Sequence, residues 1–305
     1  MLRRIETGRT DMTGIICINK PQDFTSFDVV AVMRRCFGTK KVGHGGTLDP
    51  MATGVLPVFV GGATKAVDII PDTDKSYRAG FRLGLTSDTQ DIWGEVLTTA
   101  EAVISAEMLE QALTGFRGEI MQIPPMYSAL KVNGQKLCDL ARQGIEVERS
   151  ARPITISRLQ LISFDGTDGI IEVDCSSGTY IRTLIHDIGA ALGCGAVMTS
   201  LCRTRACGFM LSQCKTIEEV RAADADTLAS WLLPVEQVFS PLYRIDLDEV
   251  QQRLYLNGVR LDAARLEKTP PEGQRCTVYG GGRFFGLAEV NAENELVSVK
   301  RFPVE

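Results

Sequence analysis

The stretch VGHGGTLDPMATGVLPV, residues 42–58, joins a glycine-rich loop to an apolar run that is typical of a buried strand. Its four glycines free the backbone for close approaches or positive φ angles. The loop matches neither the G-x-G-x-x-G pattern nor the G-x-x-x-x-G-K-[ST] pattern of phosphate-binding loops. We interpret it as a loop that presents one carboxylate, Asp49, at the bottom of a cleft. Turn formation by Asp49-Pro50 alone explains the residues equally well at this point.

The sequence around this loop predicts a mixed α/β fold. Alternation and glycine punctuation predict strands at residues 14–19, 55–60, 76–85 and 170–176. Helices are expected to begin after N-cap residues Ser26, Ser105 and Thr179. A domain boundary is expected after Pro234. The remaining tail combines one helix, residues 247–256, with short strands from 276 to 302, so we expect a small β-rich domain.

Residues 122–150 differ in composition from the rest of the chain. They begin with a Pro-Pro turn and contain a short helix that ends at Gly144. Few large apolar residues stand at either end, and basic residues are frequent: Lys131, Lys136, Arg142, Arg149 and, just beyond, Arg152. This composition predicts a basic excursion from the core.

Two further residues are candidate partners of Asp49. Arg182, in SSGTYIRTLIHDIG, is expected in the first turn of a helix, where the helix dipole disfavours a cation. A fixed anionic partner would explain this placement, and if that partner is Asp49, the arginine keeps the carboxylate ionised and oriented. Tyr77 stands on a predicted strand beside cations, so it could stack on a base. An ordinary surface arginine and a core tyrosine are the alternatives.

Composition excludes several classes of protein. The chain has 305 residues, 44% of them hydrophobic and 23% charged, which is typical of a globular protein. No apolar run approaches the roughly 20 residues that span a bilayer, and no apolar segment follows Arg3 and Arg4, so we expect a cytoplasmic protein. Nine scattered cysteines without a C-x-x-C pair, together with only two histidines, argue against a zinc site. A net charge of -5 argues mildly against non-specific nucleic-acid binding but leaves room for a local basic face.

Taken together, these stretches resemble the TruB family, the tRNA pseudouridine-55 synthases that modify the T loop. The matching pieces run in the family's order from residue 14 to about 209, and they include GIICINKPQDFTSFDVV, KKVGHGGTLDPMATGVLPVFVGGATK, KSYRAGFRLG, SDTQDIWGEV, IPPMYSALKVNGQKLCDLARQGIEVER, CSSGTYIRTLIHDIGAALG and TSLCRTRACGF. The resemblance implies the pseudouridine synthase fold, with a mixed, largely antiparallel central sheet flanked by helices. It also implies a catalytic domain at 1–236, with an RNA-clamping insertion at about 120–152, and a PUA-like RNA-binding domain at 237–305.

The resemblance implies roles for seven residues. Asp49 matches the catalytic aspartate, Arg182 the arginine that pairs with it, and Tyr77 the tyrosine that stacks against the target base. The other matches are expected to bind or support the substrate: His44 holds the RNA loop with its base turned out, Tyr180 and Leu201 line the uracil pocket, and Lys20 of the N-K-P motif supports the active site. The chain departs from the family at Gly45, where many members have threonine, at Cys138, where an aromatic residue is common, and at Cys202 and Ala206-Cys207, which replace the usual arginine and small residues.

The implied reaction breaks the N-glycosidic bond of a uridine, rotates the uracil and joins its C5 to the sugar. It requires no metal and no nucleotide cofactor. Asp49 could attack the sugar, attack the base or remove a sugar proton, and the sequence does not choose among these. The expected partner is the T stem-loop of tRNA, bound by a monomer without an obligate protein partner and without a membrane.

Two alternatives stay open at this point. The first is an RNA-folding chaperone with a vestigial site. The second is a synthase that depends on a guide RNA, although such relatives carry long basic extensions, whereas this chain has an acidic balance and a short tail.

Overall fold

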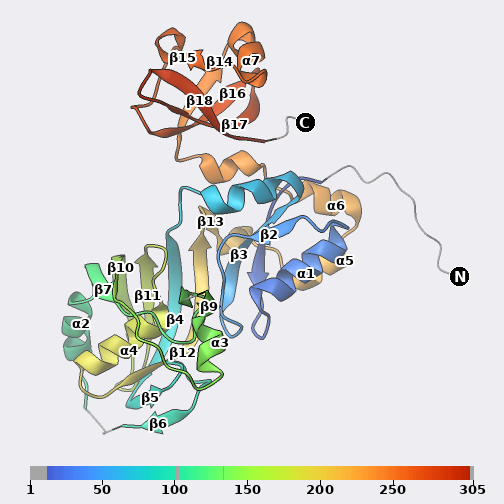
Figure 1. The fold of residues 1–305 in the computed structure, drawn as a ribbon. Coiled ribbons are helices and arrows are strands. Elements are labelled where there is room, and N and C mark those ends of the chain that lie inside the picture. The colour runs from blue at the N-terminus through green and yellow to red at the C-terminus, as the bar shows by residue number, and fades with distance from the viewer. Residues whose placement is uncertain (1–11, 100–102, 133, 303–305) are drawn as a thin grey trace, which may run out of the picture.

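The computed structural model describes residues 12–99, 103–132 and 134–302. Its main body is a nine-stranded mixed sheet (Figure 1). Along the sheet the strands follow the order β1 (Gly14–Lys20), β3 (Thr53–Val60), β12 (Ala196–Ala206), β4 (Lys75–Leu83), β11 (Asp168–Cys175), β10 (Arg152–Phe164) and β7 (Gly118–Gln122), with β2 (Val42–His44) on β3 and β13 (Phe209–Met210) on β12. Every pair is antiparallel except β12 with β3. The expected fold class is therefore confirmed.

Helices cover the two halves of this sheet. Helix α1 (Ser26–Cys36) and α5 (Ile217–Ala222) share an apolar core with β1 and β3, whereas α2 (Ala106–Thr114) and α4 (Ile181–Ala191) share one with β4, β10 and β11. The shorter elements of this body are η1 (Gly61–Ile69), η2 (Leu211–Gln213), α6 (Ala225–Ser230) and η3 (Val235–Phe239). Since the two cores lie on either side of the junction between β3 and β12, the loops at this junction can form a cleft between them.

The tail forms a separate five-stranded sheet, as expected for a β-rich end of the chain (Figure 1). Its order is β14 (Tyr243–Leu247), β16 (Arg275–Gly280), β17 (Arg283–Val290), β18 (Glu295–Arg301) and β15 (Leu261–Asp262), with α7 (Glu249–Leu256) and η4 (Ala263–Arg265) between strands. Phe284 and Phe302 of this part pack on Phe239 of the main body, with ring centroids 6.1 and 5.8 Å away. This aromatic contact joins the two sheets.

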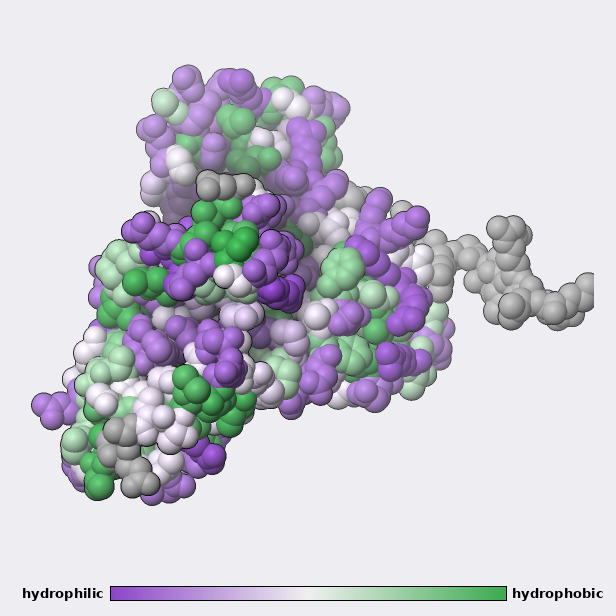
Figure 2. All heavy atoms as spheres, turned by 60° about the horizontal axis from the view of Figure 1, so that its bottom comes forward, coloured by the Kyte–Doolittle hydropathy of each residue, from purple (hydrophilic) through white to green (hydrophobic). Residues whose placement is uncertain are grey.

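The segment between β7 and β10 leaves the main sheet. It contains a small hairpin of β8 (Lys131–Val132) and β9 (Gln135–Lys136), followed by α3 (Leu137–Ala141). Leu137 and Leu140 of α3 are buried. Another short hairpin, β5 (Leu85–Ser87) with β6 (Val96–Thr98), follows β4. Figure 2 shows a face on which hydrophilic residues predominate and hydrophobic ones gather in small groups. Among the described residues, no helix is long and apolar enough to cross a membrane.

Two of the three expected N-caps are wrong. The N-cap of α1 is Thr25, which forms a capping box with Asp28, and Ser26 instead exchanges hydrogen bonds with the backbone of Leu48. Helix α4 begins after Tyr180, whose side chain makes no capping hydrogen bond, and the hydroxyl of Thr179 donates to the carbonyl of Ser176. In both places a hydroxyl next to the helix start found another partner. The expected cap Ser105 is confirmed.

Candidate active site

A cavity of about 230 Å³ lies where the loop before β3 meets β4, β12 and the start of α4. Five of the seven predicted site residues line it, namely Asp49, Tyr77, Tyr180, Arg182 and Leu201. Lys20 and His44 lie outside the lining. The remaining lining comes from residues 46–48, Lys75, Ser128, Ala129 and residues 178, 179 and 181. The fold thus brings five separate segments of the chain to one cavity.

The two charges predicted to pair do lie together. Nε of Arg182 is 3.1 Å from Oδ2 of Asp49. The arginine side chain is 6% exposed, whereas the aspartate side chain is 45% exposed. A buried guanidinium therefore orients a carboxylate that solvent or a ligand can still reach.

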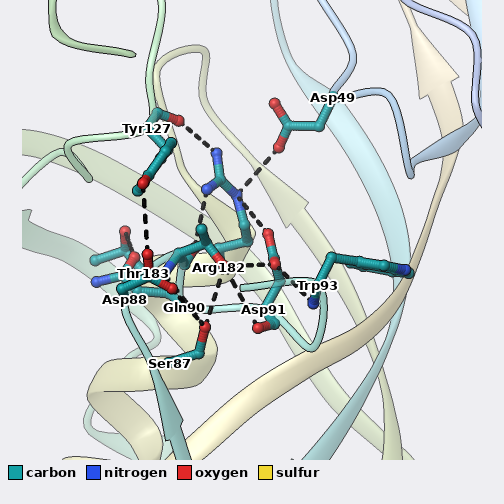
Figure 3. Close-up of polar contacts among 10 residues, drawn as sticks. Asp49, Ser87, Asp88, Gln90, Asp91, Trp93, Tyr127, Arg182 and Thr183 are labelled. Carbon is teal, nitrogen blue, oxygen red and sulfur yellow. Dashed lines mark hydrogen bonds and ion pairs between the residues drawn. The ribbon is translucent and has the colours of Figure 1, made fainter. Parts of the chain in front are cut away.

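A second carboxylate, which the sequence did not single out, shares this arginine. Oδ2 of Asp91 lies 3.8 Å from Nε of Arg182, so both carboxylates point toward the same edge of the guanidinium (Figure 3). Oδ1 of Asp91 accepts hydrogen bonds from the Thr89 hydroxyl at 2.6 Å and from the Trp93 N–H at 3.1 Å. The only signal in the sequence was its place in a turn-rich stretch, SDTQDIWG, where aspartates commonly bond to the backbone.

The other donors of Arg182 bind backbone carbonyls. Nη1 donates to the carbonyl of Thr89 at 3.0 Å, and Nη2 donates to that of Tyr127 at 2.7 Å. Tyr127 belongs to the segment between β7 and β10, so this segment closes one side of the cavity. The guanidinium is held from three separate loops, which fixes its orientation.

The start of α4 has an unusual partner. The side-chain amide of Gln122 accepts from the N–H of Tyr180 at 2.8 Å and donates to its carbonyl at 3.1 Å. Gln122 is buried, and the side chain of the N-cap residue Tyr180 makes no capping hydrogen bond. The amide therefore satisfies backbone groups at the turn that carries Arg182. Nothing in the sequence around Gln122 indicated this contact.

Lys20 binds the loop of Asp49 through the carbonyl of Pro50. It is fully buried, and its Nζ donates to the carbonyls of Pro21, Phe24 and Pro50 at 2.9, 2.5 and 3.0 Å. Burial lowers the pKa of Lys20 from its ordinary value of 10.5 to about 8, while the nearby Asp49 acts in the opposite direction. The ammonium has three protons for three carbonyls, and one of these carbonyls follows Asp49 directly.

Arg203 on β12 is a third buried cation near the site, and the sequence analysis did not single it out. Its side chain is fully buried and donates to the carbonyls of Val55, Thr47 and Gly46 at 2.8, 3.2 and 3.1 Å. Gly54 allows the backbones of β3 and β12 to lie close together at this point, since a Cβ there would lie 2.2 Å from the carbonyl oxygen of Arg203. Arg203 therefore fixes residues 46 and 47 of the glycine-rich loop to the sheet, whereas Lys20 binds the same loop at Pro50.

Tyr77 and Leu201 form part of the cavity wall. Tyr77 is 7% exposed and stands opposite Arg203 in the pairing of β4 with β12. Burial raises the pKa of Tyr77 to about 12, although the Arg203 cation acts against this. The phenol is therefore protonated at neutral pH, so it can donate a hydrogen bond and offer its ring face.

His44 lies on β2, half-buried and away from the cavity lining. Burial lowers the pKa of His44, and the Arg203 cation lowers it further. Its imidazole is thus neutral at neutral pH. In the described part of the chain, no three histidine, cysteine, aspartate or glutamate side chains gather as a metal site would require.

Gly45 and Cys207, which the resemblance marks as departures from the family pattern, lie next to each other. A Cβ added at Gly45 would lie 3.0 Å from Sγ of Cys207 and 3.2 Å from Cε2 of Phe59. Cys207 is buried and occupies the space into which a larger residue at position 45 would extend. Glycine at one position and cysteine at the other therefore belong together.

This packing predicts coupled effects on stability. Gly45→Ala is expected to lower the free energy of unfolding by about 1–3 kcal/mol, as overpacking does. Adding Cys207→Ala should restore part of this loss, with a coupling energy of about 0.5 kcal/mol or more in urea unfolding. Gly43→Ala is the matched control, because its Cβ would meet Val67 at an ordinary 3.5 Å. Strictly additive effects at positions 45 and 207 would contradict the coupling.

Comparison with known proteins identifies the family. Residues 34–181 match the TruB family pseudouridylate synthase N-terminal domain, and residues 182–240 match the tRNA pseudouridylate synthase B C-terminal domain. A tRNA pseudouridine synthase B of Clostridium tetani is 43% identical over 283 residues, which cover 92% of this chain and 97% of the relative. The protein of the same name from Pseudomonas putida is 41% identical over 299 residues, 97% of each chain.

Solved structures share the fold of this chain. A Cbf5–Nop10–Gar1 complex contains a chain that is 25% identical, with a TM-score of 0.72 over 96% of this chain and 85% of that one. An archaeal box H/ACA Nop10–Cbf5 complex, at 23% identity and a TM-score of 0.70, shares the fold over 97% of this chain and 86% of its own. Matched over most of its length by both domains and by these relatives, the chain belongs to the TruB family of pseudouridylate synthases.

Proposed function

We propose that this isomerase converts the uridine at position 55, in the T loop of tRNA, to pseudouridine. The observation that carries the proposal is the half-exposed Asp49 carboxylate, held by the buried Arg182 at a cavity of about 230 Å³. The near full-length likeness to relatives named tRNA pseudouridine synthase B supports tRNA as the substrate.

In this proposal Asp49 is the essential carboxylate and Arg182 orients it. A carboxylate that acts as nucleophile or base must be ionised, and a buried guanidinium 3.1 Å away favours that form. Tyr77 stacks against the target base, because its ring forms part of the cavity wall. Tyr180 and Leu201 line the rest of the uracil pocket, and Lys20 keeps the Asp49-Pro50 turn in place.

The target base must leave its stack before it can enter the cavity, which costs a few kcal/mol. Stacking on Tyr77 returns about 1–3 kcal/mol of this. His44, on β2, then helps to hold the RNA loop from which the base has turned out. The segment at about 120–152, which reaches Arg182 through the carbonyl of Tyr127, clamps the RNA. We expect this segment to order further when RNA binds.

The remaining assignments follow the same proposal. Residues 1–236 are the catalytic domain and residues 237–305 are a PUA-like domain that binds RNA. The protein acts as a monomer in the cytoplasm, without a cofactor and without a partner protein. Recognition rests on the shape of the loop and on its 2′-hydroxyls and phosphates.

The test is to incubate the purified protein alone with an unmodified tRNA transcript and to map pseudouridine. The expected product is a single pseudouridine in the T loop. RNA binding without product would favour the chaperone, and product that appears only with added guide RNA or partner proteins would favour the guide-dependent type. Product at a different position would overturn position 55 but keep the reaction.

The lowered pKa of Lys20 predicts that the rate of the reaction falls at alkaline pH. With a pKa of about 8, it is an ammonium below pH 8 and a neutral amine above it. The neutral amine has two protons, too few for three carbonyls, so one hydrogen bond is lost. Loss of the bond to Pro50 would release the turn that carries Asp49. We expect kcat to fall above about pH 8, and we expect Lys20→Met to lower the rate and remove this limb of the profile.

The pH dependence of stability distinguishes a fall in kcat caused by Lys20 deprotonation from a fall caused by unfolding. Because the pKa is lower in the folded protein than the ordinary 10.5, the unfolded chain binds more protons between pH 8 and 10.5. The contribution of Lys20 to stability therefore rises with pH in this window. Circular dichroism at each pH should show a folded protein while kcat falls, and an unchanged alkaline limb in Lys20→Met would contradict the assignment.

A further inference from the structure

Lys75 is a cation of the active-site cavity to which the proposed function gives no role. It is the first residue of β4, and it lies on the same face of that strand as Tyr77. Both residues line the cavity. A Cβ added at Gly46, which also lines the cavity, would lie 3.5 Å from Cε of Lys75. The end of the Lys75 side chain therefore lies beside the loop that carries Asp49.

The ammonium of Lys75 is not paired with a carboxylate. Over residues 12–99, 103–132 and 134–302, no carboxylate oxygen lies within 4.0 Å of its Nζ. The thiols of Cys175 and Cys207 lie nearby, but burial raises the pKa of both, so they are neutral at neutral pH. Nζ donates to the carbonyl of Thr73 at 2.9 Å, in an exposed position. An ammonium has three donors, so Nζ can bind a ligand as well.

Arg203 adds a second positive charge on this side of the cavity. The same added Cβ at Gly46 would lie 3.6 Å from Nη1 of Arg203. Arg203 is fully buried, and its donors meet backbone carbonyls, which are dipoles without a net charge. Burial lowers the pKa of Lys75 and the Arg203 cation lowers it further, while Asp74 acts in the opposite direction. Two cations beside Gly46 give this side of the cavity a positive potential, which favours an anion.

The other side of the cavity already has its charges matched. The Arg182 guanidinium lies 3.1 Å from Asp49 and 3.8 Å from Asp91. The base and the sugar of a uridine carry no charge, so the anion that an RNA substrate brings is its phosphate. A sugar at Asp49 and a phosphate at Lys75 would suit both sides of the cavity.

We propose that Lys75 binds a phosphate that flanks the target uridine and so holds the sugar of that nucleotide at Asp49. The inference rests on the proposed function, which places the target uridine in this cavity. Hydrogen bonds from a cation to a phosphate fix the register of a nucleic acid on a protein without reading its sequence. Lys75 and Asp49 line one cavity, so both can contact a single nucleotide.

Removing the charge of the phosphate tests this contact directly. One tRNA is assembled with a neutral methylphosphonate at the linkage 5′ of the target uridine, and a second with the methylphosphonate at the 3′ linkage. The nucleotide before each altered linkage is 2′-deoxy, in these RNAs and in their phosphate controls, so that no hydroxyl cleaves the linkage. Filter binding measures Kd for the unaltered protein, Lys75→Met and Lys65→Met. Lys65, exposed on η1 outside the cavity lining, is the matched control.

The expected result is a loss of affinity that Lys75 and one phosphate share. Lys75→Met should raise Kd for the phosphate RNA about 10- to 100-fold, the range for a hydrogen bond to a charged group. A methylphosphonate at one of the two linkages should raise Kd about fivefold or more for the unaltered protein and for Lys65→Met. The same methylphosphonate should change Kd of Lys75→Met by less than about twofold, because the contact is already absent.

Two further variants separate the charge of Lys75 from its packing. Lys75→Arg keeps a cation and should retain most of the affinity, as a point charge on a phosphate can be replaced. Lys75→Gln should reduce the slope of log affinity against log salt by about 0.7, the change for one lost contact to a single-stranded phosphate. Thermal unfolding checks that each variant is folded, and Lys75→Gln replaces Lys75→Met in the binding test if the latter is unfolded.

Turnover of an unmodified tRNA transcript by the unaltered protein separates this proposal from the proposed function. Product formation, together with equal methylphosphonate losses in the unaltered protein and in Lys75→Met, overturns the phosphate contact and leaves the function intact. A fall in the single-turnover rate of Lys75→Met at saturating RNA, with an unchanged Kd, also overturns it, because Lys75 would then act on the reaction. Shared loss of affinity without any product supports the phosphate contact and overturns the function.

Discussion

Asp49→Asn is expected to abolish pseudouridine formation while tRNA binding survives. Asparagine has the same shape but cannot ionise, so it can serve neither as nucleophile nor as base. Loss of an essential group of this kind costs at least about 10⁴-fold in turnover. The carboxylate is 45% exposed and its main contact is Arg182, so its removal leaves the fold and most of the RNA surface unchanged. Affinity should stay within about threefold, since one charge contact near the surface changes binding little.

The measurement pairs pseudouridine mapping under single-turnover conditions with filter binding of the same transcript. Asp68→Asn is the matched control, because Asp68 is an exposed aspartate on η1 outside the cavity lining, and it should retain full activity. Robust product from Asp49→Asn would remove the assignment of the essential carboxylate. Loss of binding together with activity would show that Asp49 holds the RNA as well.

Replacement of Arg182 is expected to reduce both the rate and the stability of the protein. Arg182→Lys keeps the charge, but a compact ammonium cannot reach Asp49, Asp91 and two backbone carbonyls at once. We expect kcat to fall by about 10²–10³-fold, the scale of losing a preorganised electrostatic partner. Arg182→Met removes the charge as well and leaves Asp91, 14% exposed, without its cation. The free energy of unfolding should then fall by about 3–5 kcal/mol, as when one partner of a buried pair is lost.

The control for this prediction is another arginine with two carboxylates nearby. Arg158 lies 3.1 Å from Glu172 and 3.9 Å from Asp174, but its side chain is 49% exposed. Arg158→Met should cost less than about 1 kcal/mol, as surface ion pairs do, and should leave kcat unchanged. Urea unfolding and single-turnover rates measure both variants. Equal losses of stability and rate in Arg158→Met and Arg182→Met would show that burial of Arg182 is not the cause of its larger contribution.

Local pattern was enough to predict many elements of the fold. Apolar runs and alternation predicted β1, β3, β4 and β11, and the periodic apolar residues predicted α1, α2 and α4. The strand that passes through the middle of the sheet, β12, was not predicted. Its sequence AVMTSLCRTRA contains Arg203, which breaks the apolar pattern although it is fully buried. Its burial is possible only because three carbonyls from residues 46, 47 and 55 meet it.

The two wrong N-caps have a similar origin. Ser26 and Thr179 have the right chemistry for a cap. The Ser26 hydroxyl instead bonds to the distant backbone of Leu48, and the Thr179 hydroxyl donates to the nearby carbonyl of Ser176. A hydroxyl competes among all the partners that tertiary packing brings near it. The sequence shows the donor and acceptor, whereas packing chooses the partner.

The sequence by itself determined that the chain would be a mixed α/β protein with Asp49 in a glycine-rich loop, and that Arg182 would stand in the first turn of a helix, where the helix dipole disfavours a cation. Side-chain periodicity and turn chemistry are local, so they can be read without knowing the fold. Only the tertiary structure decided that Asp91 shares Arg182, that Gln122 binds the turn of Tyr180, and that Lys20 and Arg203 bind separate carbonyls of the loop. Each of these polar groups is buried or nearly so, and a buried polar group is stable only beside partners that distant segments supply.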